Sequence, residues 1–365
     1  IEILELQNSY RKEIEMDPVK FFERSYMDYY INSRNIFSEF VNANPDGMTF
    51  VNNATTGVNT VLRSLKLEKG DEILVTSHTY QACSNAVDFV TKKFNAKKVI
   101  VDIPFKVKDD KEIVDMILKS INMNTKLALI DTVTSPTGMR MPFEKLVFEL
   151  QLLNIDVLLD AAHGPGIVPL DLTKLNAAYV TGNCHKWLCS PKGSGFLHIR
   201  EDKISSIRPL VISHGASFDG RIGDKFAYEF GWTGTQDPTP FMCIPASIKY
   251  LEDMVDGGWP TIMKRNRELA IKGRKILCDA LEIEPPFPDY MVSSIASIEI
   301  GKGGNFQLFD IGEDPLHDIL LDKYSIQVPV IRWKHHRTKY IRISAQLYNS
   351  LAEYKYLAMV LKECL

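Results

Sequence analysis

Short apolar runs typical of buried strands alternate with helical patterns through most of the first half of the chain. Strand-like runs such as DEILVTS, KKVIVDI and KLALIDTVTS are followed by helix-like stretches such as QACSNAVDFVTKKF, IVDMILKSI and FEKLVFELQLLN. Two further strand-like runs end near Asp160 and before Thr181. This alternation predicts parallel strands wrapped by helices, with ligands gathering beyond the carboxyl ends of the strands.

The carboxyl-terminal part has a different pattern. After GGWP, a long helical stretch, TIMKRNRELAIKGRKILCDAL, ends before a PPFP turn, and the strand-like runs MVSSIASIEI and YIRISAQL follow. A chain of 365 residues is too long for one small core. We therefore expect a large domain over residues 30–250 and a small mixed domain formed by residues 1–29 and 251–365.

An acid and a lysine follow two of the predicted strands. Asp160 ends the apolar run in VLLDAAHGPG, and Lys186 follows the run in AAYVTGNCHKW. At neighbouring strand ends, such an acid can keep a pyridine nitrogen protonated, while such a lysine can form an imine with an aldehyde. Few other chemistries need both groups so placed, so the pair predicts pyridoxal 5'-phosphate as cofactor.

A phosphate site is expected where NATTGVN opens a helix. Thr55 and Thr56 offer hydroxyls there, and the next residue, Gly57, gives close access to the backbone. The amino terminus of a helix supplies unpaired N–H groups and the positive end of a dipole. A threonine that caps the helix is the alternative interpretation.

Two further side chains suit the same cofactor. Tyr80, in SHTYQAC after a strand, can stack on a pyridine ring, and His78 is its nearest rival. His163, three residues after Asp160, can lie near the phenolic oxygen, and together the acid and the histidine would set the electronics of the cofactor.

The segment NCHKWLCSPKG contains the lysine and more phosphate candidates. Asn183 and His185 can reach the phosphate, and Lys192 competes with Lys186 for the catalytic role. We favour Lys186 because it lies nearer the end of the AAYVT strand, where burial would lower the pKa of the amine as imine formation requires.

The composition excludes several classes of function. A formal net charge of −3 provides no basic surplus to neutralise nucleic-acid phosphates. No apolar run approaches membrane-spanning length, and the first residues are acidic and amphipathic, unlike a secretory leader. The six cysteines are scattered without a CxxC pair, which argues against zinc and suits a reducing compartment, so we expect a cytoplasmic protein without a metal.

Taken jointly, these motifs resemble the class V aminotransferase family of fold-type I pyridoxal phosphate enzymes. Within it, NATTGVNTVLRSL, LDAAHGPG, GTQD and IRISAQLYN look like the isopenicillin N epimerase-like branch, which also contains carbon-sulfur lyases. The resemblance runs from about Asn52 to the carboxyl end. It implies an α/β fold-type I transferase, with a mainly parallel sheet wrapped by helices plus a smaller α+β domain.

The resemblance also implies roles for two later residues. Thr235 in WTGTQD matches a position that reaches the phosphate in the partner subunit, which implies a homodimer. Arg342 in YIRIS matches the arginine that pairs with the α-carboxylate of the substrate, a task that suits a bidentate guanidinium, with Arg332 and Arg337 as rivals.

Two departures from the family pattern bear on function. Cysteine desulfurases carry a nucleophilic cysteine shortly before the carboxylate-binding arginine, whereas residues 314–342 contain no cysteine, which disfavours persulfide formation. The branch also usually begins with a segment rich in asparagine and glycine near the substrate, and this chain starts at what looks like the helix after it.

The expected reaction starts from an amino acid held by Arg342. Lys186 takes the proton from Cα while the cofactor, held by Asp160, accepts the electrons. Return of the proton on the other face gives epimerisation, loss of a β-sulfur group gives a carbon-sulfur lyase, and protonation of the cofactor gives an aminotransferase. We expect an epimerase-like or lyase activity first and transamination second. A catalytically idle regulatory protein and a nicotinamide-linked dehydrogenase are weaker alternatives, the latter because TTG stands where GxGxxG would be expected.

Overall fold

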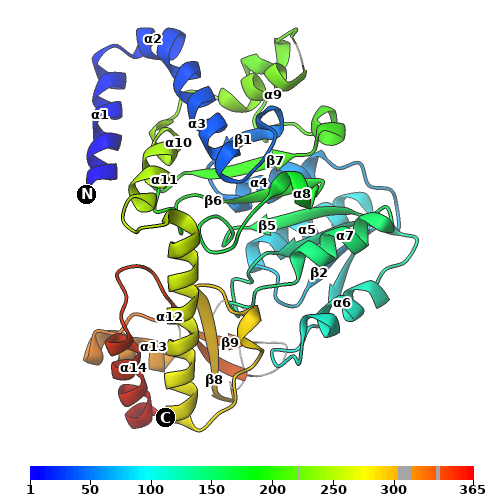
Figure 1. Ribbon diagram of the computed structural model, residues 1–365. Helices are drawn as coiled ribbons and strands as arrows, with labels where there is room; N and C mark the ends of the chain where they lie inside the picture. The colour runs from blue at the N-terminus through cyan, green and yellow to red at the C-terminus, as the bar shows by residue number, and fades with distance from the viewer. Residues whose placement is uncertain (221, 303–313, 334–337) are drawn as a thin grey trace.

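The computed structural model describes residues 1–220, 222–302, 314–333 and 338–365 (Figure 1). Its main element is a seven-stranded sheet in the order β1-β7-β6-β5-β4-β2-β3. The strands are β1 (Met48–Val51), β2 (Glu72–Thr76), β3 (Lys97–Val101), β4 (Thr125–Asp131), β5 (Asp156–Ala161), β6 (Tyr179–Asn183) and β7 (Gly195–Ile199). Neighbouring strands from β3 to β6 are parallel, and β7 pairs antiparallel with both β6 and β1. The predicted α/β architecture with a mainly parallel sheet is confirmed.

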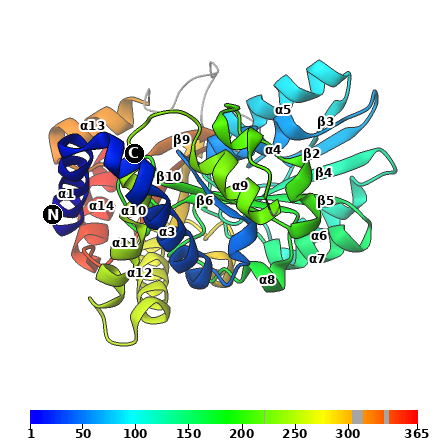
Figure 2. The ribbon, with the colours of Figure 1, turned by 90° about the horizontal axis from the view of Figure 1, so that it is seen from above.

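Helices cover both faces of this sheet (Figure 2). One face packs against α4 (Ala54–Ser64) and α5 (Gln81–Phe94), and the other packs against α3 (Tyr26–Phe40), α6 (Asp110–Lys119) and α7 (Phe143–Leu152). In β4, Leu127 and Leu129 join the first core, while Ala128 and Ile130 join the second. A strand buried on both faces has to be apolar at every position, which explains the continuous apolar runs of the sequence.

A smaller antiparallel sheet follows in the carboxyl-terminal part. Its order is β8-β10-β9, with β8 (Ile295–Lys302), β9 (Val330–Trp333) and β10 (Thr338–Ser344). The long helix α12 (Gly258–Leu281) leads into it and packs against β8 and α14 (Leu351–Cys364), with α13 (Pro315–Tyr324) between β8 and β9 in sequence (Figure 1). The predicted long helix and both predicted strand runs of this part are present.

The amino-terminal segment lies apart from the small sheet. It forms α1 (Glu2–Met16), the short α2 (Pro18–Lys20) and a π-helical turn, η1 (Phe21–Ser25). The Gln7 side chain donates to Thr239 Oγ1 over 3.1 Å, so α1 packs on α10 (Thr239–Met242), next to α11 (Ile244–Glu252). The division into 30–250 and 1–29 with 251–365 stays a prediction, and this contact favours grouping α1 with the main sheet.

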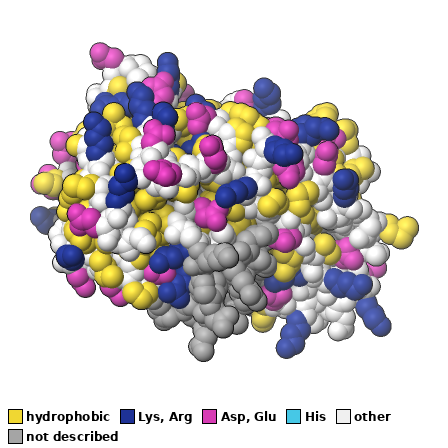
Figure 3. Space-filling model, turned by 90° about the horizontal axis from the view of Figure 1, so that it is seen from below, with side chains coloured by type: hydrophobic (Ala, Val, Ile, Leu, Met, Phe, Trp, Pro, Cys, Tyr) yellow, Lys and Arg dark blue, Asp and Glu magenta, His cyan; other side chains and the backbone are white. Residues whose placement is uncertain are grey.

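The remaining helical segments are short or lie on loops. They are η2 (Pro45–Gly47), α8 (Leu172–Leu175), η3 (Glu201–Ser206), η4 (His214–Ser217), α9 (Ile222–Gly231) and η5 (Asp289–Met291). Among the described residues, no helix is long and apolar enough to cross a membrane. Basic and acidic side chains intermingle over the described part of the face in Figure 3.

Candidate active site

A cavity of about 330 Å³ lies at the carboxyl ends of the parallel strands. This is the position at which open α/β sheets bind ligands, and the volume is in the range of small-molecule sites. Its walls come from the loop before α4, the turns after β2 and β6, the ends of β4 and β5, and β10 of the small sheet. The lining residues are Asn53, Ala54, Thr55, Tyr80, Asp131, Val133, Ser135, Asp160, Ala162, His163, Asn183, His185, Lys186 and Arg342.

Asp160 is held rigidly near the end of β5. Its side chain is 4% exposed, and Oδ1 accepts a hydrogen bond of 2.9 Å from the backbone N–H of Ala162. The Cys83 thiol on α5 donates to Oδ2 over 3.4 Å. Burial raises the pKa of Asp160, while the Ala162 N–H and the Lys186 ammonium act against that rise. A cation at the open side of this carboxylate would therefore favour its ionised form.

Lys186 lies in the turn after β6, within reach of His163. The Lys186 Nζ and the His163 Nε2 are 3.1 Å apart. Burial lowers the pKa of Lys186; the Asp160 carboxylate opposes this and the Arg342 guanidinium adds to it. Lowering the pKa raises the fraction of free amine, the form that can attack an aldehyde or remove a proton.

His163 is buried and neutral. Burial lowers the pKa of His163 well below its ordinary value, and the Lys186 and Arg342 cations act in the same direction. On its other side, the ring accepts a hydrogen bond of 3.1 Å at Nδ1 from the indole N–H of Trp187.

The amino terminus of α4 is organised by asparagines. The Asn53 side chain caps the helix by accepting from the backbone N–H of Thr56, and Asn183 Oδ1 accepts from the N–H of Ala54 over 2.9 Å. Thr55 lines the cavity, whereas Thr56 does not. The Thr56 hydroxyl instead donates to Asn53 Oδ1 over 3.2 Å. Because Asn53 is the cap, a capping role does not occupy the Thr55 hydroxyl. At Gly57, a Cβ would come within 2.0 Å of Thr181 Oγ1, so close packing of α4 on β6 requires glycine.

The structure distinguishes between Tyr80 and His78, the two candidates for stacking on a pyridine ring. Tyr80 lines the cavity and is 39% exposed. His78 is fully buried, with Nδ1 at 2.6 Å from Thr137 Oγ1 and Nε2 at 2.9 Å from the carbonyl oxygen of Ile103. Of the two, Tyr80 is the aromatic side chain that is available to a ligand.

Arg342 reaches the cavity from the small sheet. Its guanidinium donates to the carbonyl oxygen of Ser135, and its Nε is buried without a hydrogen-bond partner in the described part of the chain. Burial lowers the pKa of Arg342. The rival Arg332 instead pairs with the buried Asp314 over 2.6 Å, and Arg337 lies outside the described residues.

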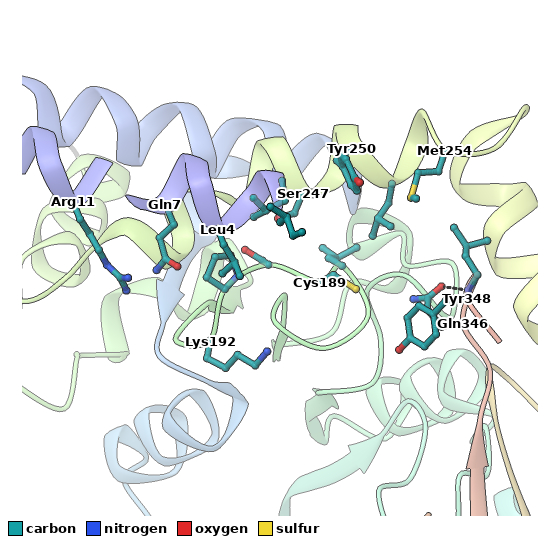
Figure 4. Close-up of a pocket in the computed structure, with 17 residues that line it drawn as sticks. Leu4, Gln7, Arg11, Cys189, Lys192, Ser247, Tyr250, Met254, Gln346 and Tyr348 are labelled. Carbon is teal, nitrogen blue, oxygen red and sulfur yellow. Dashed lines mark hydrogen bonds between the residues drawn. The ribbon is translucent and has the colours of Figure 1, made fainter. Parts of the chain in front are cut away.

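Lys192 and Thr235 lie elsewhere. Lys192 is exposed and lines a larger cavity of about 660 Å³ between α1, α11 and residues 346–348, together with Cys189 (Figure 4). Thr235 is exposed on the segment between α9 and α10 and is not among the residues that line the 330 Å³ cavity. A cavity role for Thr235 in this subunit is thus not supported by the geometry, whereas a role toward a partner subunit stays a prediction.

Sequence reasoning did not single out Asp131 or Ser135. Asp131 ends β4, pairs in register with Asp160, and its Oδ2 is buried without a hydrogen-bond partner in the described residues. Burial raises the pKa of Asp131 well above its ordinary value, and the Asp160 carboxylate adds to the rise. The available signal was an acid at the end of the KLALID run, the same pattern that marked Asp160.

The cavity fits pyridoxal 5'-phosphate. A half-buried amine, a buried carboxylate and an aromatic ring face one space, beside the amino terminus of α4. Two polar atoms that line it, Asp131 Oδ2 and His185 Nδ1, are buried and lack hydrogen-bond partners among the described residues. Orphaned buried polar atoms of this kind are expected where a polar ligand completes a site. Within the described ranges, no cluster of His, Cys, Asp or Glu suits a metal ion.

Comparison with known sequences decides the family. The profile of the family Aminotransferase class-V matches residues 15–309. The chain belongs to this family. Pyridoxal 5'-phosphate is accordingly its cofactor, and the chain is a pyridoxal phosphate-dependent enzyme of this family.

Individual relatives fall in the expected branch. The hercynylcysteine sulfoxide lyase of Schizosaccharomyces pombe is 26% identical, over 96% of this chain and 88% of the relative. The isopenicillin N epimerase of Amycolatopsis lactamdurans is 28% identical, over 95% of this chain and 87% of the relative. The structure of the cystine C-S lyase C-DES superimposes with a TM-score of 0.81 at 18% identity, over 98% of this chain and 93% of that one, and shows the shared fold.

Proposed function

We propose that this enzyme is a carbon-sulfur lyase that acts on a cysteine-derived α-amino acid. The observation that carries the proposal is the pair of Lys186 and Arg342 in one cavity: an amine whose pKa is lowered by burial, and a half-buried guanidinium that also faces this space. The first group removes a proton and the second holds a carboxylate. Relatives that are named lyases or cysteine desulfhydrases support the choice of leaving group.

Each residue of the cavity has a task toward the cofactor. When bound, pyridoxal 5'-phosphate withdraws electrons from the substrate Cα. Asp160 would hold the pyridine nitrogen in its protonated form, and Tyr80 would stack on the ring. The phosphate would bind at the amino terminus of α4, where the assigned side chains are Thr55, Asn183 and His185. The Thr56 hydroxyl, which was also expected to contribute, is bonded to Asn53 instead and does not line the cavity.

Arg342 and Lys186 handle the substrate. Arg342 binds the α-carboxylate and thereby orients the Cα–H bond toward Lys186. Lys186, once its amine is free, takes the Cα proton, and His163 Nε2 lies 3.1 Å from its Nζ. The β-sulfur substituent then leaves with the electrons of the C–S bond and is protonated to a thiol. The released enamine tautomerises to an imine, which water hydrolyses to a keto acid and ammonia. Because residues 314–342 contain no cysteine, the persulfide-forming route of desulfurases is disfavoured.

Epimerisation at Cα is the second candidate, because two relatives are isopenicillin N epimerases. Both reactions begin with the same proton transfer to Lys186. They differ in the second step, since an epimerase returns a proton to the opposite face of Cα and a lyase expels the β-substituent.

A homodimer is part of the proposal. Thr235 is exposed on the segment between α9 and α10, where its hydroxyl is free to reach the phosphate of the partner subunit. All six cysteines are free thiols, which supports a cytoplasmic location.

A substrate screen tests the proposed reaction. Purified protein is incubated with S-substituted cysteines, cysteine, cystine and representative amino acids without β-sulfur, and the assay follows keto acid, ammonia and optical rotation. We expect keto acid and ammonia in equal amounts from a sulfur-containing substrate. Optical inversion without ammonia would identify an epimerase instead, and amino-group transfer to an added keto acid would identify an aminotransferase.

Two lysine variants make the screen specific. Lys186→Ala should reduce turnover by at least about a thousandfold, because it removes the proton acceptor. Lys192→Ala is the matched control, since this exposed lysine lines the other cavity, and it should retain wild-type turnover. Equal activity of the two variants would contradict the assignment of Lys186.

A further inference from the structure

The His163 ring makes contacts through both of its nitrogens. Nδ1 accepts from the indole N–H of Trp187 over 3.1 Å, and Nε2 lies 3.1 Å from Lys186 Nζ. Trp187 is 9% exposed and His163 8% exposed, so water competes little for either contact. The buried Trp187 indole therefore makes a hydrogen bond that affects which nitrogen of His163 carries the proton.

The indole contact determines where the imidazole proton lies. An indole N–H donates a hydrogen bond and cannot accept one, so the Nδ1 that receives it must carry a lone pair. A neutral imidazole has one N–H, which then has to be at Nε2. The Nε2–H is directed at Lys186 Nζ, where the free amine offers a lone pair and an ammonium does not.

We propose that Trp187 is a positioning residue that fixes His163 as its Nε2–H tautomer, and that His163 thereby donates to the free amine of Lys186. An ammonium at Lys186 would present N–H groups to another N–H group, which disfavours the protonated lysine. The other titratable and charged groups acting on Lys186 are Asp160, Cys83 and Asp131, which favour the ammonium, and Arg342, which disfavours it.

This arrangement gives His163 a defined role. With Nδ1 held by Trp187 and Nε2 already protonated, the ring has no lone pair free to accept a proton from Lys186. His163 therefore acts as a hydrogen-bond donor that keeps Lys186 reactive, and a proton gained by Lys186 has to leave to another acceptor. The tautomer itself does not depend on the proposed function; its consequence for catalysis rests on Lys186 being the base.

Nitrogen NMR of the full chain tests the tautomer directly. The eight histidines are labelled with ¹⁵N, His163 is assigned with a His163→Gln variant, and spectra are recorded near neutral pH with the protein as purified. We expect an unprotonated Nδ1 and a protonated Nε2 for His163. A protonated Nδ1 in the wild-type protein would overturn the proposal, and this result needs no variant that has to fold.

Two tryptophan variants test the cause. Trp187→Phe keeps an aromatic ring but removes the N–H, so the His163 signals should shift toward the other tautomer. Trp259→Phe is the matched control, because it also removes a buried indole N–H, one that donates to the carbonyl oxygen of Ile248 over 3.1 Å. Unchanged His163 signals in Trp187→Phe, or the same change in both variants, would contradict the role of Trp187.

A second readout follows the lysine itself. The rate at which Lys186 couples to added pyridoxal 5'-phosphate is measured against pH after cofactor removal, with borohydride trapping. In Trp187→Phe the profile should move up by about one pH unit, the size set by one net hydrogen bond. An unmoved profile would count against the proposal. The expected tautomer without any coupling at Lys186 would instead refute the proposed function and leave the tautomer assignment standing.

Discussion

At the scale of single residues, burial works against the charged form of both principal groups. It raises the pKa of Asp160 and lowers the pKa of Lys186, although each group favours the charged form of the other. A pyridinium nitrogen next to Asp160 would supply a nearby cation and would weaken the stabilisation that Asp160 gives to a protonated Lys186. The cofactor and the two residues are thus electrostatically complementary.

Arg342 gives a prediction at this scale. Arg342→Lys keeps the charge but loses the planar fork that binds a carboxylate through two hydrogen bonds. We expect KM for the amino acid to rise about tenfold or more, with a smaller change in kcat, in steady-state assays. Arg332→Lys, which leaves a cation beside Asp314, is the control and should keep the wild-type KM. A rise in KM for Arg332→Lys alone would contradict the assignment of Arg342 and would identify Arg332 as the residue that binds the carboxylate.

Site residues that directly follow a predicted strand could be recognised from the sequence. Residues whose role depends on contacts between distant segments were harder to recognise. Lys186 was favoured over Lys192 because it lies nearer the end of a strand-like run. In the structure Lys186 lines the 330 Å³ cavity, whereas Lys192 lines the 660 Å³ cavity. Asp131 follows the same pattern but was missed, because its proximity to Asp160 arises from strand register. The Trp187 contact was also out of reach, since sequence does not show which way an indole N–H points.

At the scale of secondary structure, the antiparallel strand β7 is the departure from simple alternation. Its direction depends on the connection over residues 184–194, which turns the chain back so that Asn183 at the end of β6 pairs with Gly195 at the start of β7. The central strands β2, β4 and β5 were predictable because the sheet is buried on both faces there, which makes each of them a mainly apolar run.

His198 in β7 gives a pH-dependent prediction. Burial lowers the pKa of His198 to about 4 from 6.5, so the folded protein keeps the ring neutral while the unfolded chain takes up a proton. The stability from this difference is present above pH 6.5 and is lost as pH falls toward 4, to a limit of about 3 kcal/mol. His198→Gln should lose less free energy of unfolding than wild type over that range in urea titrations.

A second histidine provides the control for that measurement. His214 is exposed in η4, and His214→Gln should follow the wild-type pH dependence closely. Equal slopes for the wild-type protein and His198→Gln would show that the buried ring is not the source of the acid sensitivity.

At the scale of the whole molecule, one exposed residue is expected to link cofactor binding to dimer formation. Thr235 lies outside the cavity of its own subunit, and its expected task requires a second subunit. Sedimentation velocity should give about twice the chain mass of 41.4 kDa. Thr235→Ala should remain dimeric but bind pyridoxal 5'-phosphate about tenfold more weakly, because one hydrogen bond to a charged phosphate is lost. A monomer with full cofactor affinity would contradict the proposed dimer.

The assembly of the cavity from two sheets also sets the limit of prediction from sequence. Arg342 in β10 reaches the end of β4 by contacting the carbonyl oxygen of Ser135, across more than half of the chain. Strand patterns alone do not show how the two sheets lie relative to each other. The family resemblance was therefore needed to assign a role to Arg342. The substrate side-chain pocket has no comparable signal in the sequence.

Every role assigned to the cavity depends on a covalent link between the cofactor and Lys186. The protein as purified is reduced with borohydride, digested, and its peptides are mapped by mass spectrometry, with the visible absorption recorded before and after reduction. We predict a yellow protein whose absorption is lost on reduction and whose pyridoxyl adduct lies on Lys186. An adduct on Lys192 would contradict the assignment of the site, and a colourless protein that takes up no added pyridoxal 5'-phosphate would contradict the assignment of the cofactor.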